Sequence, residues 1–249
     1  MINNYKANMA RLFKHIYFIG GCIIALVVTF LFSSGTYVLP FLAKYSLVES
    51  MIFVGAAMVL YFSAFIPVFQ NPEYSDGMIK NRILCGYTQQ QVFFANLLSM
   101  ETAVVIMSAI YLCSGAIGLA VAGEHLTLGA LGRILIFIVA LMGYVALLNT
   151  ISFRLTNMIA NSIVCVFMFF MGFNLVMFGN AAIAFSTGTF FRVARIIYNI
   201  NVLGQWFIAC DLADEIASPG VAGQLLLSVL VIALSVAVGL FRLSKRDLK

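Results

Sequence analysis

Charged residues are scarce in this chain, and their scarcity excludes a soluble globular domain. They make up 9% of its 249 residues, while hydrophobic residues make up 63%. Soluble domains carry about 25% charged residues, so this composition predicts a polytopic membrane protein. Each spanning helix needs about 20 mostly apolar residues, and the chain is therefore too short to hold a further soluble domain beside six such helices.

Residues that support catalysis or metal binding are also few. The two histidines, His15 and His125, are predicted at opposite faces of the membrane, and the five cysteines include no CxxC pair. This pattern predicts neither a metal site nor a disulfide framework. No GxxxxGK[ST] phosphate-binding loop occurs, so we do not expect this chain to hydrolyse ATP or to be an enzyme.

Six apolar segments predict an all-α membrane protein with six transmembrane helices. The predicted spans are residues 16–39, 47–69, 92–121, 131–151, 159–178 and 224–240. Residues 1–15 place apolar side chains at helical spacing with basic residues between them, which indicates an interfacial helix on the membrane surface. Residues 179–223 are too apolar for a disordered linker, and we expect extracellular helices over about 190–200 and 206–216.

The distribution of Lys and Arg predicts the orientation of the chain. If the N-terminus is cytoplasmic, ten of the fourteen basic residues lie inside and four lie outside, as the positive-inside rule requires. The ten are Lys6, Arg11, Lys14, Lys80, Arg82, Arg154, Arg242, Lys245, Arg246 and Lys249, and the four are Lys44, Arg133, Arg192 and Arg195. Both termini are thus predicted in the cytoplasm. The net charge of +5 follows from topology and does not indicate nucleic acid.

A polar stretch, residues 71–91, separates the second span from the third and predicts a short cytoplasmic helix over 76–87. Asp76 can cap its first turn, and Gly86 can end it in the left-handed conformation. Thr88 and Gln91 then form a capping box that starts the third span. We expect its apolar side to rest on the spans; that side carries Met78, Ile79, Ile83 and Leu84. The basic side chains of Lys80 and Arg82 are expected to face water or a partner. An ordinary loop with a little helix is the alternative.

The sequence EYSDGMIKNRILCGYTQQQVFFANLL resembles the segment between the second and third spans of type-2 ABC permeases. An acidic residue, then Gly, a hydrophobic pair, a basic residue and Asn, and then Gly-Tyr recur there. Met78, Lys80 and Gln89 to Gln91 depart mildly from the commonest pattern. The resemblance implies a coupling helix that docks on a separate ATPase subunit, through Glu73, Asp76, Gly77, Met78, Ile79, Lys80, Asn81, Arg82, Ile83, Gly86 and Tyr87.

The same resemblance implies partners and a transport path. The ATPase subunit would bind ATP and Mg, and a second permease subunit would complete the path through the plasma membrane, surrounded by lipid. Candidate path residues lie on the second and fifth spans: Phe53, Met58, Phe62, Phe65, Phe69, Phe167, Phe170, Met171 and Asn174. The expected function is export of a hydrophobic or amphipathic peptide, toxin or drug. Alternatives are a secondary transporter or channel, or a membrane-bound immunity or scaffold protein.

Glu101 is unusual because it lies about nine residues inside the third predicted span. A carboxylate is costly there unless it is paired, neutral or hydrated. It can sense the position of the coupling helix or a proton. The alternative is a structural hydrogen bond to a neighbouring span or to residues 71–91.

Overall fold

The computed structural model describes residues 1–38, 40, 43–75, 78–155, 157–185, 187–213 and 217–241, with the side chains of 72–80 left out of the description. The described residues form eleven α-helices and no β-strand. Six helical segments among them are long and apolar enough to cross a membrane. The chain is therefore an all-α, multi-pass membrane protein, as its composition predicts.

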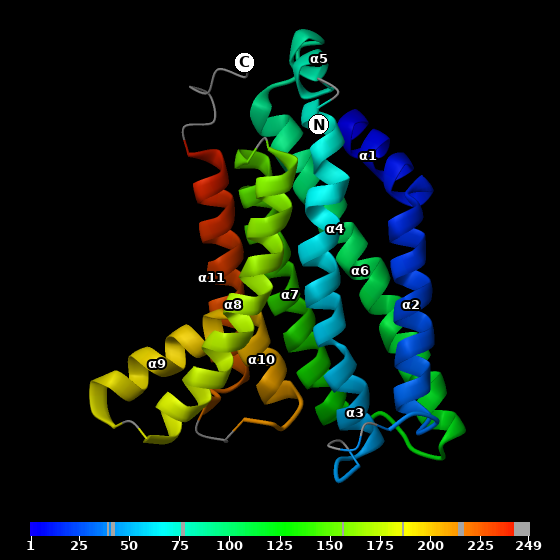
Figure 1. Cartoon of the computed structure of the whole chain (residues 1–249), viewed down its shortest axis with the longest axis vertical. Helices are drawn as coiled ribbons and strands as arrows, with labels where there is room; N and C mark the ends of the chain where they lie inside the picture. Colours follow the sequence, from blue (N-terminus) through cyan, green and yellow to red (C-terminus); the bar gives the residue numbers. More distant parts are fainter. Residues whose placement is uncertain are drawn as a thin grey trace.

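The spanning helices form one upright bundle (Figure 1). They are α2 (Ile16–Ser33), α3 with α4 (Leu47–Val54 and Ala56–Ser75), α6 (Gln89–Val121), α7 (Leu128–Arg154), α8 (Met158–Phe185) and α11 (Val221–Leu240). Helices α1 (Ile2–Lys14) and α5 (Met78–Leu84) lie at one end of the bundle, which we call the α1 end. Helices α9 (Gly188–Ile200) and α10 (Val202–Ala209) lie toward the opposite end, which we call the α9 end.

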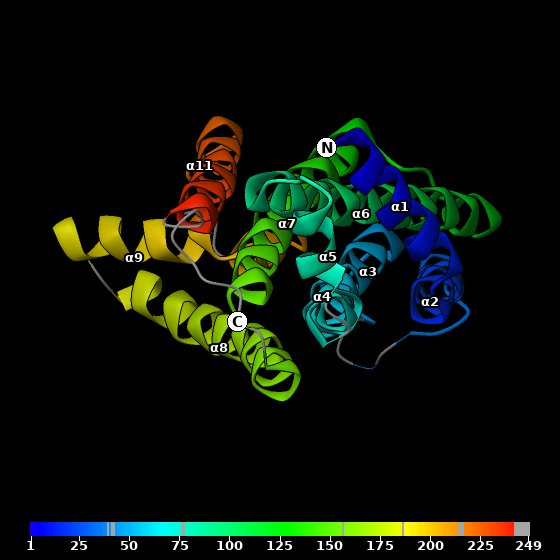
Figure 2. The same cartoon turned by 90° about the horizontal axis from the view of Figure 1, so that it is seen from above.

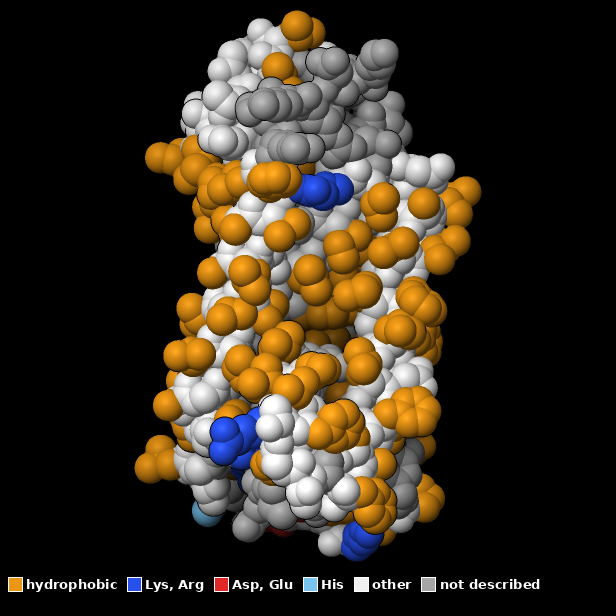
Figure 3. All heavy atoms as spheres, turned by 90° about the vertical axis from the view of Figure 1, so that its left-hand side faces the viewer, with side chains coloured by type: hydrophobic (Ala, Val, Ile, Leu, Met, Phe, Trp, Pro, Cys, Tyr) orange, Lys and Arg blue, Asp and Glu red, His pale blue; other side chains and the backbone are white. Residues whose placement is uncertain are grey.

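Helix α7 forms the centre of the bundle and contacts α4, α6, α10 and α11. In the most apolar 18-residue stretch of α7, 72% of the residues are buried, whereas the corresponding share is 22% in α2, 11% in α8 and 17% in α11. Figure 2 shows α2 on one side of the bundle and α8 and α11 spread apart on the other. The face that carries α9 and α11 is covered with apolar side chains through its middle, and the Lys and Arg side chains in view lie toward its ends (Figure 3). These outer helices therefore offer wide apolar surfaces to lipid or to another chain.

All six helix bounds differ from the predicted spans, and in the first two a glycine lies at the difference. The predicted first span, 16–39, is too long, because α2 ends at Ser33 and Gly35 takes a φ of +70°. The second is divided between α3 and α4 at Gly55, where an added Cβ would lie 2.9 Å from the Ile52 carbonyl oxygen and 3.0 Å from the Phe137 ring. A glycine is thus required for the close approach to α7. The third, fourth, fifth and sixth spans each begin earlier or end later than predicted.

Two short helices do occur between the fifth and sixth spans, but the second begins earlier than predicted. Helix α10 covers Val202–Ala209, whereas 206–216 was expected, and residues 214–216 lie outside the described part of the chain. The cause is Asn201, whose side chain accepts a hydrogen bond from the Leu203 amide at 3.1 Å and so caps α10. The Trp206 indole then donates to the Ile52 carbonyl at 3.0 Å and fixes α10 against α3.

Candidate functional site

Helix α5 projects beyond the ends of the spans, between α4 and α6 (Figure 1). It is shorter than the predicted 76–87, and residues 76 and 77, with the proposed Asp76 cap, lie outside the described residues. Its end is as predicted: Gly86 has a φ of +88°, the Gly86 amide donates to the Ile83 carbonyl at 2.9 Å, and the Tyr87 amide donates to the Arg82 carbonyl at 3.1 Å. This is a Schellman motif.

The following helix begins with the predicted capping box. The Gln91 amide donates to Thr88 Oγ1 at 3.2 Å, and the Thr88 amide donates to Gln91 Oε1 at 3.1 Å. Only a few residues therefore separate the end of α5 from the start of α6. A displacement of α5 cannot be absorbed by a long linker, because both helix ends are fixed by hydrogen bonds.

One side of α5 rests on a small apolar cluster formed by α6 and α7. Ile83 and Tyr87 contact this cluster, which consists of Val92, Phe93, Leu97, Ala146 and Phe153. Leu84 was expected on the same side, but that prediction is wrong, since 85% of Leu84 is exposed. Adjacent residues point to different sides of a helix, and Ile83 occupies the covered side. Asn81 is exposed, whereas the side chains of Glu73, Met78, Ile79 and Lys80 lie outside the description.

Arg82 points into the protein, which corrects the expectation that it faces water or a partner. Its Nη2 donates a hydrogen bond to Asn8 Oδ1 of α1 at 2.9 Å. Asn8 Nδ2 in turn donates to Asn96 Oδ1 of α6 at 2.6 Å. Asn8 and Asn96 are both buried. We call this chain of three side chains the Asn8 relay. It connects the short helix α5 to α1 and α6 through charge-assisted and buried hydrogen bonds, which are among the stronger polar contacts in proteins.

Helix α1 is fixed to the bundle by two further contacts. The Arg11 guanidinium donates to the Phe69 carbonyl of α4 at 3.0 Å and lies 3.9 Å above the Phe69 ring. The Tyr5 and Thr102 hydroxyls are 3.0 Å apart. The side of α1 that carries Asn4, Asn8 and Leu12 is buried. Sequence reasoning gave Asn8 no role; Asn4, Asn8 and Arg11 stand at helical spacing on one side of α1, but such a polar stripe ordinarily indicates a solvated face.

A second amide pair joins α4 to α7 near the same end. Gln70 Nε2 donates to Asn149 Oδ1 at 2.5 Å, and both residues are buried. Asn161 of α8 accepts a hydrogen bond from the Ser152 hydroxyl of α7 at 3.0 Å. Amides that join spans in this way hold helices in register. The α1 end therefore carries interhelical hydrogen bonds that involve α1, α4, α5, α6, α7 and α8.

His15 occupies the elbow between α1 and α2, against aromatic rings. Its ring centroid lies 5.5 Å from that of Phe65 and 5.6 Å from that of Phe69. Burial, and to a lesser extent the Arg11 guanidinium, lower the pKa of His15 below its usual range. The imidazole is therefore neutral near pH 7, and the positive charge at this elbow comes from Arg11 and Lys14.

The structural hydrogen bond that was one of the two expected roles of Glu101 of α6 is not seen at its Oε2 atom. Its Oε2 is buried and has no hydrogen-bond partner among the described residues. The hydroxyl of the neighbouring Thr102 donates a hydrogen bond to the Leu98 carbonyl at 2.7 Å and lies within hydrogen-bond distance of the Tyr5 hydroxyl. Glu101 lies in the stretch of α6 that contacts α1, and its role as a sensor of helix position or of a proton stays a prediction.

The candidate path residues fall into two groups. On α4, Met58, Phe62, Phe65 and Phe69 are buried inside this chain, and Phe53 of α3 is half-buried against the Trp206 ring at 5.2 Å between centroids. They form part of the core, and not a surface that a second subunit can contact in this conformation. On α8 the residues are exposed: Phe167, Phe170, Met171 and Asn174. The Asn174 amide bonds Phe170 O at 2.8 Å in its own helix.

The functional groups described at the α1 end are mainly amides, hydroxyls and guanidinium groups that join helices. No group of three or more His, Cys, Asp or Glu side chains suited to a metal ion occurs in the described parts of the chain. The chain matches no family model, no curated protein and no solved structure. What the α1 end contains is a short helix outside the bundle and a set of buried polar contacts that joins it to several spans.

Proposed function

We propose that this chain is the transmembrane permease subunit of an ATP-driven exporter of the type-2 ABC class, and that α5 is its coupling helix. The observation that carries the proposal is the Asn8 relay. It joins α5 to both α1 and α6 through the contacts of Arg82 at 2.9 Å and Asn96 at 2.6 Å. A simple surface loop does not need a capped end and a buried polar connection to two other helices.

In this proposal α5 docks on a separate ATP-binding-cassette subunit that binds and hydrolyses ATP with Mg. The docking residues retain their proposed roles, except Arg82, Ile83 and Tyr87, which serve the internal connections to α1, α6 and α7. Closure of the ATPase subunits displaces α5, and the relay passes the displacement to α1 and α6. The short connection between Gly86 and Thr88 favours this transmission, because hydrogen bonds fix the helix ends on both sides of it.

The functional unit in this proposal contains two copies of a six-span permease and two ATPase subunits. Six spans form a small bundle, and a symmetric dimer is the commonest way to complete a path. Helix α8 is the best candidate for its wall, because its exposed Phe167, Phe170 and Met171 offer adaptable apolar surface. We place the protein in the plasma membrane with both termini and α5 in the cytoplasm, on the evidence of the Lys and Arg distribution. The cargo is a hydrophobic or amphipathic peptide, toxin or drug.

Reconstitution tests the proposal. Proteoliposomes that contain this chain together with the ATPase subunit encoded beside it are expected to transport an amphipathic peptide in the presence of MgATP, and the purified complex is expected to hold two copies of each subunit. Neither protein alone is expected to transport. Transport by this chain alone, driven by an ion gradient, would favour a secondary transporter; stable binding of a toxin without transport would favour an immunity protein.

A further inference from the structure

A long apolar slot lies between α2 and α4 near the α1 end, separate from the relay. Its volume is about 410 Å³, and its walls include Ile16, Tyr17, Gly20, Gly21 and Ile24 of α2 and Tyr61 of α4. A cavity of about 150 Å³ holds a benzene molecule, so this slot has room for a hydrocarbon chain. Ligand pockets commonly have volumes of about 300–1,000 Å³.

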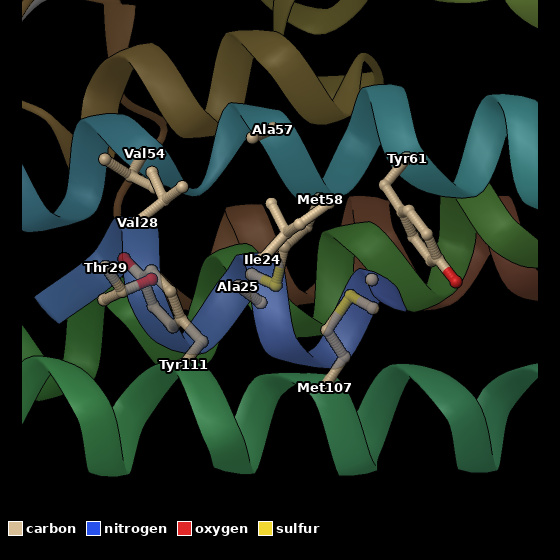
Figure 4. A pocket seen from close by; sticks show the side chains of 11 residues that line it. Ile24, Ala25, Val28, Thr29, Val54, Ala57, Met58, Tyr61, Met107 and Tyr111 are labelled. Carbon is tan, nitrogen blue, oxygen red and sulfur yellow. The ribbon is translucent and has the colours of Figure 1, made fainter. Parts of the chain in front are cut away.

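Gly20 and the Tyr61 ring give the slot its shape. Gly20 has no atom within 4 Å of the position of a Cβ, so the absence of a side chain there keeps the slot open. The Tyr61 ring covers Gly21, and its hydroxyl donates to the Tyr17 carbonyl at 3.2 Å, which fixes the ring between the two helices. Beyond Tyr61 lies a smaller cavity of about 80 Å³ between α2, α4 and α6, with Tyr61 at one end and Val54 and Thr29 at the other (Figure 4).

The outer rim of the slot faces the surroundings of the bundle. Ile16, Tyr17 and Ile24 are all more than half exposed. Because α2 and α4 both span the membrane, a molecule enters this slot sideways from the hydrocarbon layer and not from water. The slot begins at the first residues of α2, which places its mouth at the level where headgroups meet acyl chains.

Helix α1, which leads into the slot-lining helix α2, ends in basic residues and contains no acidic residue. Lys14 is exposed and stands two residues before Ile16, and Arg11 stands one turn before Lys14. The first acidic residue of the chain is Glu49, in α3 at the opposite end of the bundle. A basic group at the membrane surface attracts anionic headgroups, and Lys14 is placed to do so.

We propose that the slot between α2 and α4 binds one acyl chain of an anionic phospholipid whose headgroup contacts Lys14. The acyl chain is already in hydrocarbon, so the apolar walls hold it by van der Waals packing, while Lys14 selects the headgroup. The bound lipid fills the space between α2 and α4 and thereby supports the elbow that joins α1 to the bundle. This inference does not depend on the exporter assignment.

A pair of tryptophan reporters tests the proposal in the full-length chain in proteoliposomes. Tyr17→Trp places an indole at the rim of the slot, and Ile159→Trp places one on the lipid-exposed face of α8; each position is the second residue of its helix at the α1 end, 63% and 72% exposed. The native Trp206 is buried and serves as a common background. The vesicles contain phosphatidylcholine with a small fraction of phosphatidylglycerol, and either lipid carries bromine on its acyl chains.

Brominated phosphatidylglycerol is expected to quench Tyr17→Trp with about a fivefold preference over brominated phosphatidylcholine, the factor that one surface Lys contributes. Ile159→Trp is expected to show a much smaller preference, because the nearby Arg154 already donates to the Val238 and Phe241 carbonyls and no slot adjoins it. Adding Lys14→Gln to the Tyr17→Trp chain should remove most of the preference. Equal quenching by the two lipids at both reporters, or a preference that survives Lys14→Gln, would refute the anionic site.

Gly20→Leu separates a slot from mere attraction to the basic surface. The leucine side chain has open space to enter, and leucine favours a helix more than glycine does, so the variant is expected to fold. Adding Gly20→Leu to the Tyr17→Trp chain should abolish the preference for brominated phosphatidylglycerol. The folding control is Gly20→Leu added to the Ile159→Trp chain, in which quenching should be unchanged. A preference that persists after Gly20→Leu would overturn the acyl-chain slot.

Discussion

Replacing Asn8 with leucine is expected to reduce ATP-driven transport by about tenfold or more while leaving membrane insertion and the yield of the protein unchanged. The substitution removes the hydrogen bonds that Asn8 makes with Arg82 and Asn96. Loss of buried hydrogen bonds of this kind costs about 1–3 kcal/mol, and about 1.4 kcal/mol is a factor of ten. ATP hydrolysis by the assembled complex should continue but drive less transport, because α5 remains packed on α6 but can then move without α1.

Asn3→Leu is the matched control, because Asn3 is an exposed asparagine on the same helix. It should transport at the rate of the unsubstituted chain. Arg82→Met should resemble Asn8→Leu, and the double variant should be little worse than either, since both remove the same contact. Transport at the normal rate by Asn8→Leu, or additive losses in the double variant, would show that the relay is incidental.

Gly204→Ala is expected to give the largest loss of stability among single-methyl additions to the bundle. A Cβ at this buried position would overlap the backbone carbonyl of Tyr198, which cannot rotate away as a side chain can. The turn between α9 and α10 would have to open, which disturbs the Gln205 contacts with Asn199 O at 2.7 Å and Ser228 Oγ at 2.9 Å. Overpacking costs about 1–3 kcal/mol, a fall in Tm of about 2–12 °C for a chain of this size.

Gly132→Ala is its control, because Gly132 lies inside α7 with no atom within 4 Å of the position that the added methyl group would take. That change should be neutral or slightly stabilising, since alanine restricts the unfolded chain. Thermal unfolding in detergent, followed by circular dichroism, compares the two variants with the unsubstituted protein. Equal Tm values for Gly204→Ala and Gly132→Ala would contradict a tight turn between α9 and α10.

Hydrophobic length and helix caps were sufficient to predict much of the fold. The six spans follow from apolar runs, and the end of α5 follows from Gly86 with the capping box of Thr88 and Gln91. These features are local, because each depends on residues a few positions apart. The division of the second span at Gly55 could not be predicted in the same way, since it depends on a close approach to Phe137, a residue distant in the sequence.

The relay and the slot were beyond sequence reasoning for the same reason. Arg82 and Asn8 are separated by 74 positions, and nothing in the pattern around Arg82 shows that its guanidinium turns toward α1. The rotation of α4 was equally undetermined, so Phe62, Phe65 and Phe69 were expected to line a path, whereas they lie in the core. Periodicity indicates that a helix has an apolar side, but not which neighbour covers it.

The central claim is that α5 seats on an ATPase subunit in the cytoplasm, and the most direct test uses Cys85, an exposed free thiol one residue after α5. In membranes that contain both proteins, a short thiol-to-amine cross-linker is expected to join Cys85 to the ATPase subunit, with a yield that changes when ATP hydrolysis is trapped. A membrane-impermeant maleimide should label Cys85 in inverted vesicles and not in intact cells, and Cys85→Ser should abolish both signals. Labelling of Cys85 from outside intact cells, or the absence of any cross-link in a complex that transports, would contradict the account.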